Sequence, residues 1–275
     1  MKLEEKTVEI TDDFDLDKIL ESGQCFRPEK RPDGWYRFIS GEHLLYIRPQ
    51  GETLYAVHCE PGMWENFWHS YFDLDRSYSV LRGKLDRRDD FLQRAMEYGR
   101  GIRVLRQDAW EMLVTFIISQ RKSIPAIRTA VNLLAERYGR PLAAENGEKI
   151  FAFPTAESLC RAGEQALQQC GLGYRTRYVL HAAQQAADGT LKMAQLEALP
   201  DEALFARLME LEGVGKKVAN CVCLFGYGRV GRVPVDVWIE RLIREEFGGC
   251  DPFPQFGPEA GIVQQYLFFY KRSIG

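Results

Sequence analysis

The feature that most constrains this chain is the turn Gly213-Val214-Gly215, which separates two segments of helical periodicity. The segment before the turn, residues 201–211, carries leucines at helical spacing. The segment after it begins at Lys216 and continues with one apolar face. Two glycines permit a tight turn with positive φ and let another backbone approach closely. The sequence therefore predicts a pair of helices joined by a short hairpin.

A helix that begins at Lys216 presents unpaired N–H groups and the positive end of its dipole toward the turn. Both features suit a phosphate group. Helix, glycine turn and helix together form the helix-hairpin-helix pattern, which holds a DNA backbone without reading its sequence. A Gly-x-Gly turn by itself also joins ordinary helices, and the adjacent lysines favour the DNA interpretation. We predict that Gly213, Val214, Gly215 and Lys216 contact DNA.

Helical phase separates the roles of the two lysines. Val218, Val222 and Phe225 share the apolar face that must pack inward. Lys217 and Cys221 are four residues apart and lie together on a neighbouring face. We predict that Lys216 points to solvent or phosphate and that Lys217 faces the interior. The alternative is that both lysines bind phosphate.

A second candidate group follows the hairpin at Pro234-Val235-Asp236. Asp236 precedes a helical run and is a good N-cap residue. By itself this position favours a capping role. Capping is compatible with catalysis, because a carboxylate that accepts bonds from backbone amides is held ionised and immobile.

The composition bounds the class of protein. The 275 residues are 45% hydrophobic and carry a formal net charge of -3, which is typical of a soluble folded chain. Mild acidity argues against a general nucleic-acid coat. Residues 101–180 nevertheless hold eleven Lys/Arg and seven Asp/Glu. This local excess is compatible with a basic face and equally with scattered surface charge.

The expected compartment is the bacterial cytoplasm, with nucleoid DNA as substrate. The N-terminus is too acidic for a leader peptide, and no stretch approaches the roughly 20 apolar residues that span a bilayer. Seven cysteines without a leader predict reduced thiols. Neither the cysteines nor the four histidines show metal-ligand spacing, so we expect no structural metal and no iron–sulfur cluster.

The pattern along the chain predicts an α+β fold. Residues 35–39, 43–48 and 53–57 read as an antiparallel meander with turns at 40–42 and 50–52. From about residue 74 the periodicity is helical. We expect Asp108 to cap a buried helix containing Met112–Ile118, with Glu111 reaching back to the first amide, and Ser123 to cap the next. The expected domains are a β-rich unit, residues 1–100, and an all-α body, residues 101–275.

Five motifs in order resemble the helix-hairpin-helix DNA glycosylases, and within them the 8-oxoguanine glycosylase branch of bacterial type. The hairpin Gly213 to Cys221 matches G-V-G-x-K-V-A-x-C, and the loop matches P-V-D. Two of the other three matches are Gly23-Gln24-Cys25-Phe26-Arg27 and Leu172–Tyr178. The last is the pair Gln264 and Phe268, four residues apart on an expected C-terminal helix at about 258–272.

The resemblance implies a chemistry for these residues. Lys217 attacks the sugar C1′ and forms a Schiff base, for which desolvation favours the neutral amine. Asp236 stabilises the positive charge that develops on the sugar. The damaged base is flipped out of the duplex, and the terminal helix closes on its pocket. Cys221 and Phe268 then sandwich the base, Gln264 reads its pairing edge, and the Gly23 carbonyl accepts the N7 hydrogen of an oxidised purine.

Further residues take their roles from the same resemblance. Gln24, Phe26 and Pro234 are expected in the base pocket. Tyr174 is expected to wedge into the duplex and Arg175 to touch the opposite base. Without the resemblance, Tyr174-Arg175 is an ordinary loop, and Cys221, Gln264 and Phe268 are ordinary packing residues.

The chain departs from the family pattern at three positions. Arg121 stands where asparagine is usual, and Ala126 where eukaryotic members have arginine; both positions contact the opposite cytosine. Trp238 replaces a histidine that contacts phosphate. We expect Arg121, Lys122 and Trp238 to contact the DNA backbone, with a solvated Arg-Lys pair as the alternative.

The sequence therefore predicts a monomeric, bifunctional glycosylase and AP lyase for 8-oxoguanine in duplex DNA, acting without a cofactor. A monovalent cation held by hairpin carbonyls is compatible with the sequence. Two alternatives stay open. A glycosylase for alkylated purines would have the same fold but generally lacks the lysine, and a catalytically silent module would use the hairpin as a clamp. An iron–sulfur relative is disfavoured because the C-terminal cysteine run is missing.

Overall fold

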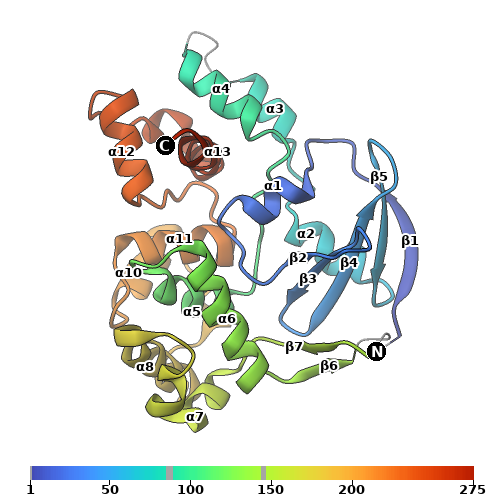
Figure 1. The fold of residues 1–275 in the computed structure, drawn as a ribbon. Helices are drawn as coiled ribbons and strands as arrows, with labels where there is room; N and C mark the ends of the chain where they lie inside the picture. The colour runs from blue at the N-terminus through green and yellow to red at the C-terminus, as the bar shows by residue number, and fades with distance from the viewer. Residues whose placement is uncertain (1, 85–88, 144–146) are drawn as a thin grey trace.

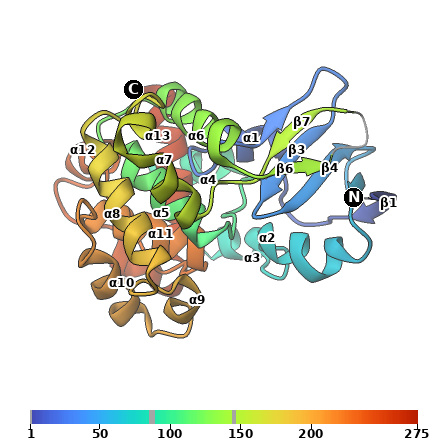
Figure 2. The same cartoon turned by 90° about the horizontal axis from the view of Figure 1, so that it is seen from below.

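The structure is a computed structural model that describes residues 2–84, 89–143 and 147–275. Figures 1 and 2 show an antiparallel sheet on one side and a helical body on the other. The sheet is built from the N-terminal part of the chain, and the body carries both the hairpin and the C-terminal helix. The α+β class predicted from the sequence is confirmed. Within the described residues, no helix is long and apolar enough to cross a membrane.

The main sheet has the strand order β1-β5-β4-β3-β2. The predicted meander corresponds to β3, β4 and β5, and Ser40 pairs with His43 across a two-residue turn in which Gly41 has φ +57°. The sequence missed β1, because this strand is mostly acidic and only Val8 is buried. The strands are β1 Glu4–Glu9, β2 Glu29–Lys30, β3 Tyr36–Ser40, β4 His43–Pro49 and β5 Leu54–Cys59.

Both faces of this sheet are covered. On one face Phe38 and Leu45 pack with the aromatic residues of the segment that follows β5, including Trp68. On the other face Leu44 packs with Ile150 from a small hairpin. This explains why four successive residues of β4 are buried rather than alternate ones.

The small hairpin corrects one prediction, because the body is not all-α. Strands β6, Pro141–Ala143, and β7, Lys149–Phe151, pair antiparallel within residues 101–275. Figure 2 shows them beside β3 and β4. Each strand has only three residues, too few for the alternation that identifies a strand in a sequence.

The remaining elements are helical. The first group is α1 Leu16–Glu21, the π-helix η1 Trp64–Trp68, α2 His69–Tyr71, α3 Tyr78–Gly83, α4 Asp90–Tyr98, α5 Ala109–Ser119 and α6 Ile124–Tyr138. The second is α7 Ala156–Gln168, η2 Gly173–Arg175, α8 Thr176–Ala187, α9 Met193–Leu196, α10 Asp201–Met209 and α11 Lys216–Tyr227. The last is α12 Val237–Glu246, η3 Phe253–Glu259 and α13 Ala260–Ile274.

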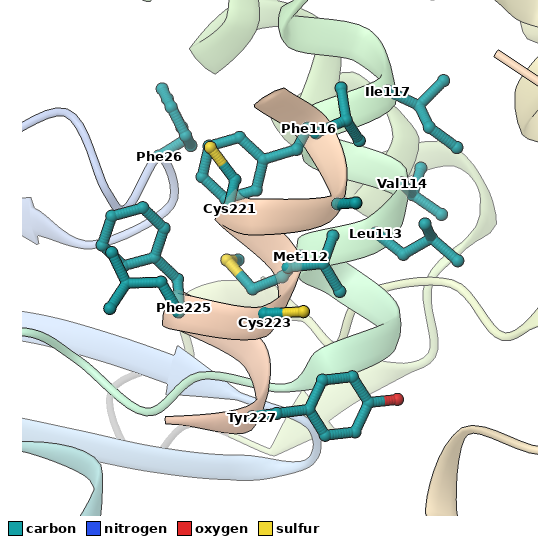
Figure 3. Packing of buried hydrophobic residues seen from close by; sticks show 14 of the residues in the cluster. Phe26, Met112, Leu113, Val114, Phe116, Ile117, Cys221, Cys223, Phe225 and Tyr227 are labelled. Carbon is teal, nitrogen blue, oxygen red and sulfur yellow. The ribbon is translucent and has the colours of Figure 1, made fainter. Parts of the chain in front are cut away.

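Helices α5 and α11 form the centre of the body (Figure 3). Every residue from Met112 to Ile118 is buried, as the apolar run predicts. Asp108 caps α5 by accepting a hydrogen bond from the Glu111 amide at 2.7 Å. Ser123 occupies the N-cap of α6 but makes no side-chain cap bond.

The core clusters divide the chain differently from the predicted border at residue 100. Buried side chains of α3 and α4, such as Tyr78 and Leu92, belong to the helical cluster and not to the sheet. Helix α4 lies against α13, as Figure 1 shows. The N-terminal unit therefore contributes two helices to the body, because α13 needs a partner for its apolar face.

A buried ion pair joins the two halves, and it corrects the expected role of Glu111. Its carboxylate does not reach back to the helix start but accepts a bond from Arg27 Nη1 at 2.9 Å. Arg27 also donates to the Phe151 carbonyl in β7. Burial raises the pKa of Glu111 to about 7, and the opposing charge of Arg27 limits the rise. The pair ties the loop after α1 to the first turn of α5.

We predict that Arg27→Met destabilises the protein by about 3–5 kcal/mol, because it leaves a carboxyl group buried without its partner. The pKa of Glu111 is raised in the folded state, so the folded protein holds a proton that the unfolded chain releases. The loss in urea denaturation should therefore be smaller at pH 5 than at pH 8. Arg140→Met, which breaks an exposed pair with Glu42, is the control and should cost at most about 1 kcal/mol. A pH-independent loss would contradict the account.

Candidate active site

Five separate parts of the chain meet around a small cavity of about 40 Å³. They are the loop after α1, the end of α5, one side of α11 from Lys217 to Phe225, the loop before α12, and the middle of α13. The lining residues are Gly23, Phe116, Lys217, Cys221, Phe225, Pro234, Asp236, Gln264, Gln265 and Phe268. Seven of these were predicted as catalytic or base-pocket residues, and the structure brings those seven together.

Lys217 lies in the first turn of α11 and is half-buried, whereas its neighbour Lys216 is exposed. This agrees with the helical phase. The Lys217 Nζ donates to Ser119 Oγ at 3.3 Å and lies 5.0 Å from the centroid of the Phe116 ring. The end of α5 therefore fixes the position of the amine at the edge of the cavity.

Cys221 follows Lys217 by one turn and is buried. Figure 3 shows its side chain beside the ring of Phe116. Burial raises the pKa of the Cys221 thiol to about 11, although Lys217 opposes the rise. The group is therefore a neutral thiol near pH 7, and it presents a polarisable surface to the cavity rather than a nucleophile.

Asp236 has the capping role predicted from the sequence and also borders the cavity. It is the N-cap of α12, and its Oδ1 accepts hydrogen bonds from the amides of Trp238 at 3.1 Å and Ile239 at 3.0 Å. It also lines the same cavity as Lys217. A carboxylate held by two amides at a helix N-terminus is fixed in orientation and stabilised as an anion.

Gln264 and Phe268 lie one turn apart on α13. Gln264 is 3% exposed, and its Oε1 has no hydrogen-bond partner among the described residues. A buried amide oxygen without a partner is costly unless a ligand supplies a donor. The Phe268 ring lies against Gly23, where an added Cβ would be 3.1 Å from its Cε1.

The cavity as it stands holds about one water, whose share of liquid volume is roughly 30 Å³. A purine is far larger, so base entry requires side chains to move. Phe268 is half-buried and borders both the cavity and Gly23. Its displacement would open the site without disturbing the buried core.

Two predicted pocket residues lie outside this cavity. Gln24 is fully buried and bonded to the backbone, with Nε2 donating to the Arg103 carbonyl at 2.8 Å and Oε1 accepting from the Leu105 amide at 2.7 Å. Phe26 packs edge-on against Phe116, with ring centroids 6.1 Å apart. Neither residue lines the cavity, and Phe26 instead packs behind the lining residue Phe116.

The residues predicted to contact DNA differ in how exposed they are. Tyr174 is 53% exposed, as a wedge residue requires. Arg175 is instead buried, with Nε donating to the Gln120 carbonyl at 2.8 Å and its guanidinium 4.4 Å from the Tyr174 ring centroid. An isolated loop arginine is expected to be solvated, but here the exposed carbonyl at the end of α5 binds it. Contact with an opposite base requires Arg175 to leave this position.

Arg121 and Lys122 follow α5. Arg121 is exposed and has φ +50°, a conformation that asparagine tolerates better than arginine. Lys122 Nζ donates to the Gly171 carbonyl at 2.7 Å, and burial lowers its pKa. Ala126 and Trp238 are both half-buried. Of this group, Arg121 has the side chain most available to a phosphate.

The hairpin packs more tightly than the glycine pattern alone implies. Gly213 has φ +79°, and an added Cβ would lie 2.3 Å from the Tyr178 ring. Its carbonyl accepts a bond from Gln120 Nε2 at 3.0 Å. Gly215 has extended backbone and open space around it. The structure therefore needs glycine at 213 for two separate reasons.

The sequence missed Ser119, Phe116 and Gln265. Phe116 and Ser119 are three apart on α5, so they share a face toward α11. That signal was hidden in an apolar run in which every face is buried. Gln265 precedes Tyr266 in a largely apolar helix and gave no periodic signal.

Comparisons with known proteins agree on one family. A family model described as "8-oxoguanine DNA glycosylase, N-terminal domain" matches residues 7–113. A second, "HhH-GPD superfamily base excision DNA repair protein", matches residues 114–254. The chain belongs to the HhH-GPD superfamily of base excision DNA repair proteins, in its 8-oxoguanine glycosylase branch.

Three relatives illustrate the similarity. A Saccharomyces cerevisiae N-glycosylase/DNA lyase is 35% identical over 54% of this chain and 42% of its own length. The chain thus spans less than half of that relative. The Arabidopsis thaliana N-glycosylase/DNA lyase OGG1 is 30% identical over 92% of this chain and 76% of its own. The Clostridium acetobutylicum 8-oxoguanine glycosylase/lyase, solved with DNA containing cytosine opposite 8-oxoG, is 30% identical and superposes with a TM-score of 0.90 over 100% of this chain and 98% of its own.

The two hairpin glycines are predicted to differ in how much stability is lost when each is replaced by alanine. Gly213→Ala should cost about 1–3 kcal/mol or more of stability, because alanine is strained at positive φ and its Cβ overlaps Tyr178. Gly215→Ala should cost less than about 1 kcal/mol, because its backbone is extended and unobstructed. Urea denaturation of both variants measures the difference. Equal losses would mean that the turn tolerates a side chain at both positions.

Proposed function

We propose that this chain is a bifunctional DNA glycosylase and AP lyase that excises 8-oxoguanine from duplex DNA in base excision repair. The observation that carries the proposal is the convergence of three groups on one cavity: the Lys217 amine, the fixed Asp236 carboxylate, and the unpartnered Gln264 Oε1. An amine and an anion serve attack on a sugar, and the buried amide oxygen serves recognition of a base edge.

The glycosylase step follows from this arrangement. The nitrogen of Lys217 forms a bond to the sugar C1′ as the bond from C1′ to the base nitrogen breaks. The base leaves with the electron pair and takes up the proton that the alkylated nitrogen of Lys217 releases. Positive charge develops on the sugar while the bond breaks, and Asp236 offsets it electrostatically. Because Asp236 is already oriented by two amides, little reorganisation is needed during the reaction.

The lyase step uses the same lysine. Ring opening converts the adduct into a protonated imine, a Schiff base between Lys217 and the sugar. Loss of a C2′ proton then expels the 3′ phosphate, and water releases Lys217 from the product. Both steps need the amine on the cavity side of α11, where the structure has it.

Duplex DNA is expected to bind across the hairpin and the exposed Tyr174. The helix start at Lys216 offers its amides and dipole to a phosphate, and Tyr174 is free to enter the stack as the base leaves it. We further propose that the protein acts as a monomer in the bacterial cytoplasm. The monovalent cation at the hairpin carbonyls stays a prediction.

The alternatives differ in what they ask of Lys217. A non-catalytic DNA-binding module does not require a half-buried lysine that lines a cavity together with a carboxylate. A monofunctional glycosylase for alkylated purines forms no imine with the sugar and so does not require the Lys217 amine. Of the three proposals, only the bifunctional one uses Lys217, Asp236 and Gln264 together.

Borohydride trapping on a duplex containing 8-oxoguanine tests the proposal. We expect the wild type to give a covalent protein–DNA adduct and Lys217→Gln to give none, because the imine is the reducible species. Lys216→Gln is the matched control and should still give the adduct, with weaker DNA binding. An adduct that persists in Lys217→Gln would place the nucleophile elsewhere. Excision without any adduct would favour the alkyl-purine alternative.

A further inference from the structure

The C-terminal end of α1 is held in an uncommon way. A helix leaves its last carbonyls without intrahelical partners, and here the four carbonyls of residues 19–22 all accept bonds from side chains. Ile19 accepts from Ser22 Oγ at 2.7 Å, which is a local bond. The other three donors come from distant helices: Arg128 Nη2 to Leu20 at 2.9 Å, Arg272 Nη2 to Glu21, and Gln265 Nε2 to Ser22 at 2.5 Å.

We call Arg128, Arg272 and Gln265 the carbonyl clamp. Arg128 belongs to α6, and Arg272 and Gln265 belong to α13. Two of its members are cations at a helix C-terminus, where the dipole favours positive charge. Because all three reach α1 from the helical body, the clamp fixes the position of this helix end relative to the cavity and not merely its local conformation.

The residue after the clamped carbonyls is Gly23, which lines the cavity. Gly23 has φ +81°, and an added Cβ would be 3.1 Å from both Phe268 Cε1 and Arg272 Nη1. On its other side, Gln24 is fixed by the backbone of residues 103 and 105. Within the described part of the chain, the Gly23 carbonyl itself accepts no hydrogen bond. The backbone on both sides is therefore anchored, and one acceptor is left free.

We propose that the carbonyl clamp positions the Gly23 carbonyl as a rigid acceptor that distinguishes a purine protonated at N7 from an ordinary one. This inference rests on the proposed function. In guanine N7 is itself a hydrogen-bond acceptor. Its lone pair and the lone pair of the Gly23 carbonyl oxygen therefore repel each other. In the oxidised base the N7–H donates to that oxygen. The three clamp residues are positioning residues, because they act through the Gly23 backbone.

Rigidity is what makes this acceptor selective. A carbonyl that turned freely would avoid the repulsion with guanine and would bind the N7–H less often. Loss of one clamp bond should therefore slow excision of the oxidised base. It should leave cleavage at an abasic site unchanged, because that reaction uses Lys217 but presents no base to Gly23.

Arg128→Met is the most informative variant, since Arg128 lies outside the cavity and methionine keeps its apolar stem. The two measurements are single-turnover excision of 8-oxoguanine and β-elimination on a duplex with a preformed abasic site. Arg128→Lys retains a donor and should restore most of the excision rate. Arg137→Met, an exposed arginine on the same helix α6, is the matched control and should leave both rates unchanged.

We expect Arg128→Met to slow excision by about 10- to 100-fold with abasic-site cleavage at the wild-type rate. An equal loss in both reactions would overturn the proposal, because it would indicate general damage to the fold, and so would no loss in either. If thermal melting shows that Arg128→Met does not fold, Arg272→Met removes a different member of the clamp, one that is not among the residues lining the cavity, and carries the same expectation. Failure of the proposed function is a separate outcome, in which the wild type itself neither excises the base nor cleaves the abasic site.

Discussion

The structure depends on the packing of the end of α5 against the beginning of α11. The Gly213 turn lets α11 start close to α5, and Gln120 at the end of α5 bonds the Gly213 carbonyl. One residue earlier, Ser119 accepts a bond from Lys217 Nζ, and Ser119 Oγ itself lies 2.8 Å from the Phe116 carbonyl, to which it donates. The end of α5 therefore holds both the hairpin turn and the Lys217 amine in place. Without this contact, the flexible Lys217 side chain would have no fixed position at the edge of the cavity.

The site divides into a fixed wall and a movable part. Lys217 and the backbone just before Gly23 are held by hydrogen bonds to distant parts of the chain, and Asp236 is held by the amides of the helix that it caps. Phe268 is half-buried and borders both the small cavity and Gly23. A fixed wall favours pre-organised electrostatics, while the movable ring keeps the cavity small when no base is bound. The buried pair of Arg27 and Glu111 contributes by keeping the loop after α1 attached to α5.

The residues differ in how well the sequence predicted them. Lys217, Cys221 and Val218 follow helical phase, so one turn signal was enough to separate the inward lysine from the outward one. Asp236 was predictable as a cap, and its second role came from the family resemblance. A motif marks a segment and does not say which of its side chains face the cavity, so the sequence could not show that Gln24 and Phe26 lie behind the lining residues. Arg175, β6 and the carbonyl clamp depend on contacts between distant segments, which local pattern does not encode.

The most direct test of the central claim is to locate the sugar remnant in the reduced protein–DNA adduct by peptide mass spectrometry. The account predicts that fragmentation of the peptide spanning both hairpin lysines assigns the added mass to Lys217, because its amine faces the cavity with Asp236. Assignment to Lys216, or to an amine outside α11, would contradict it.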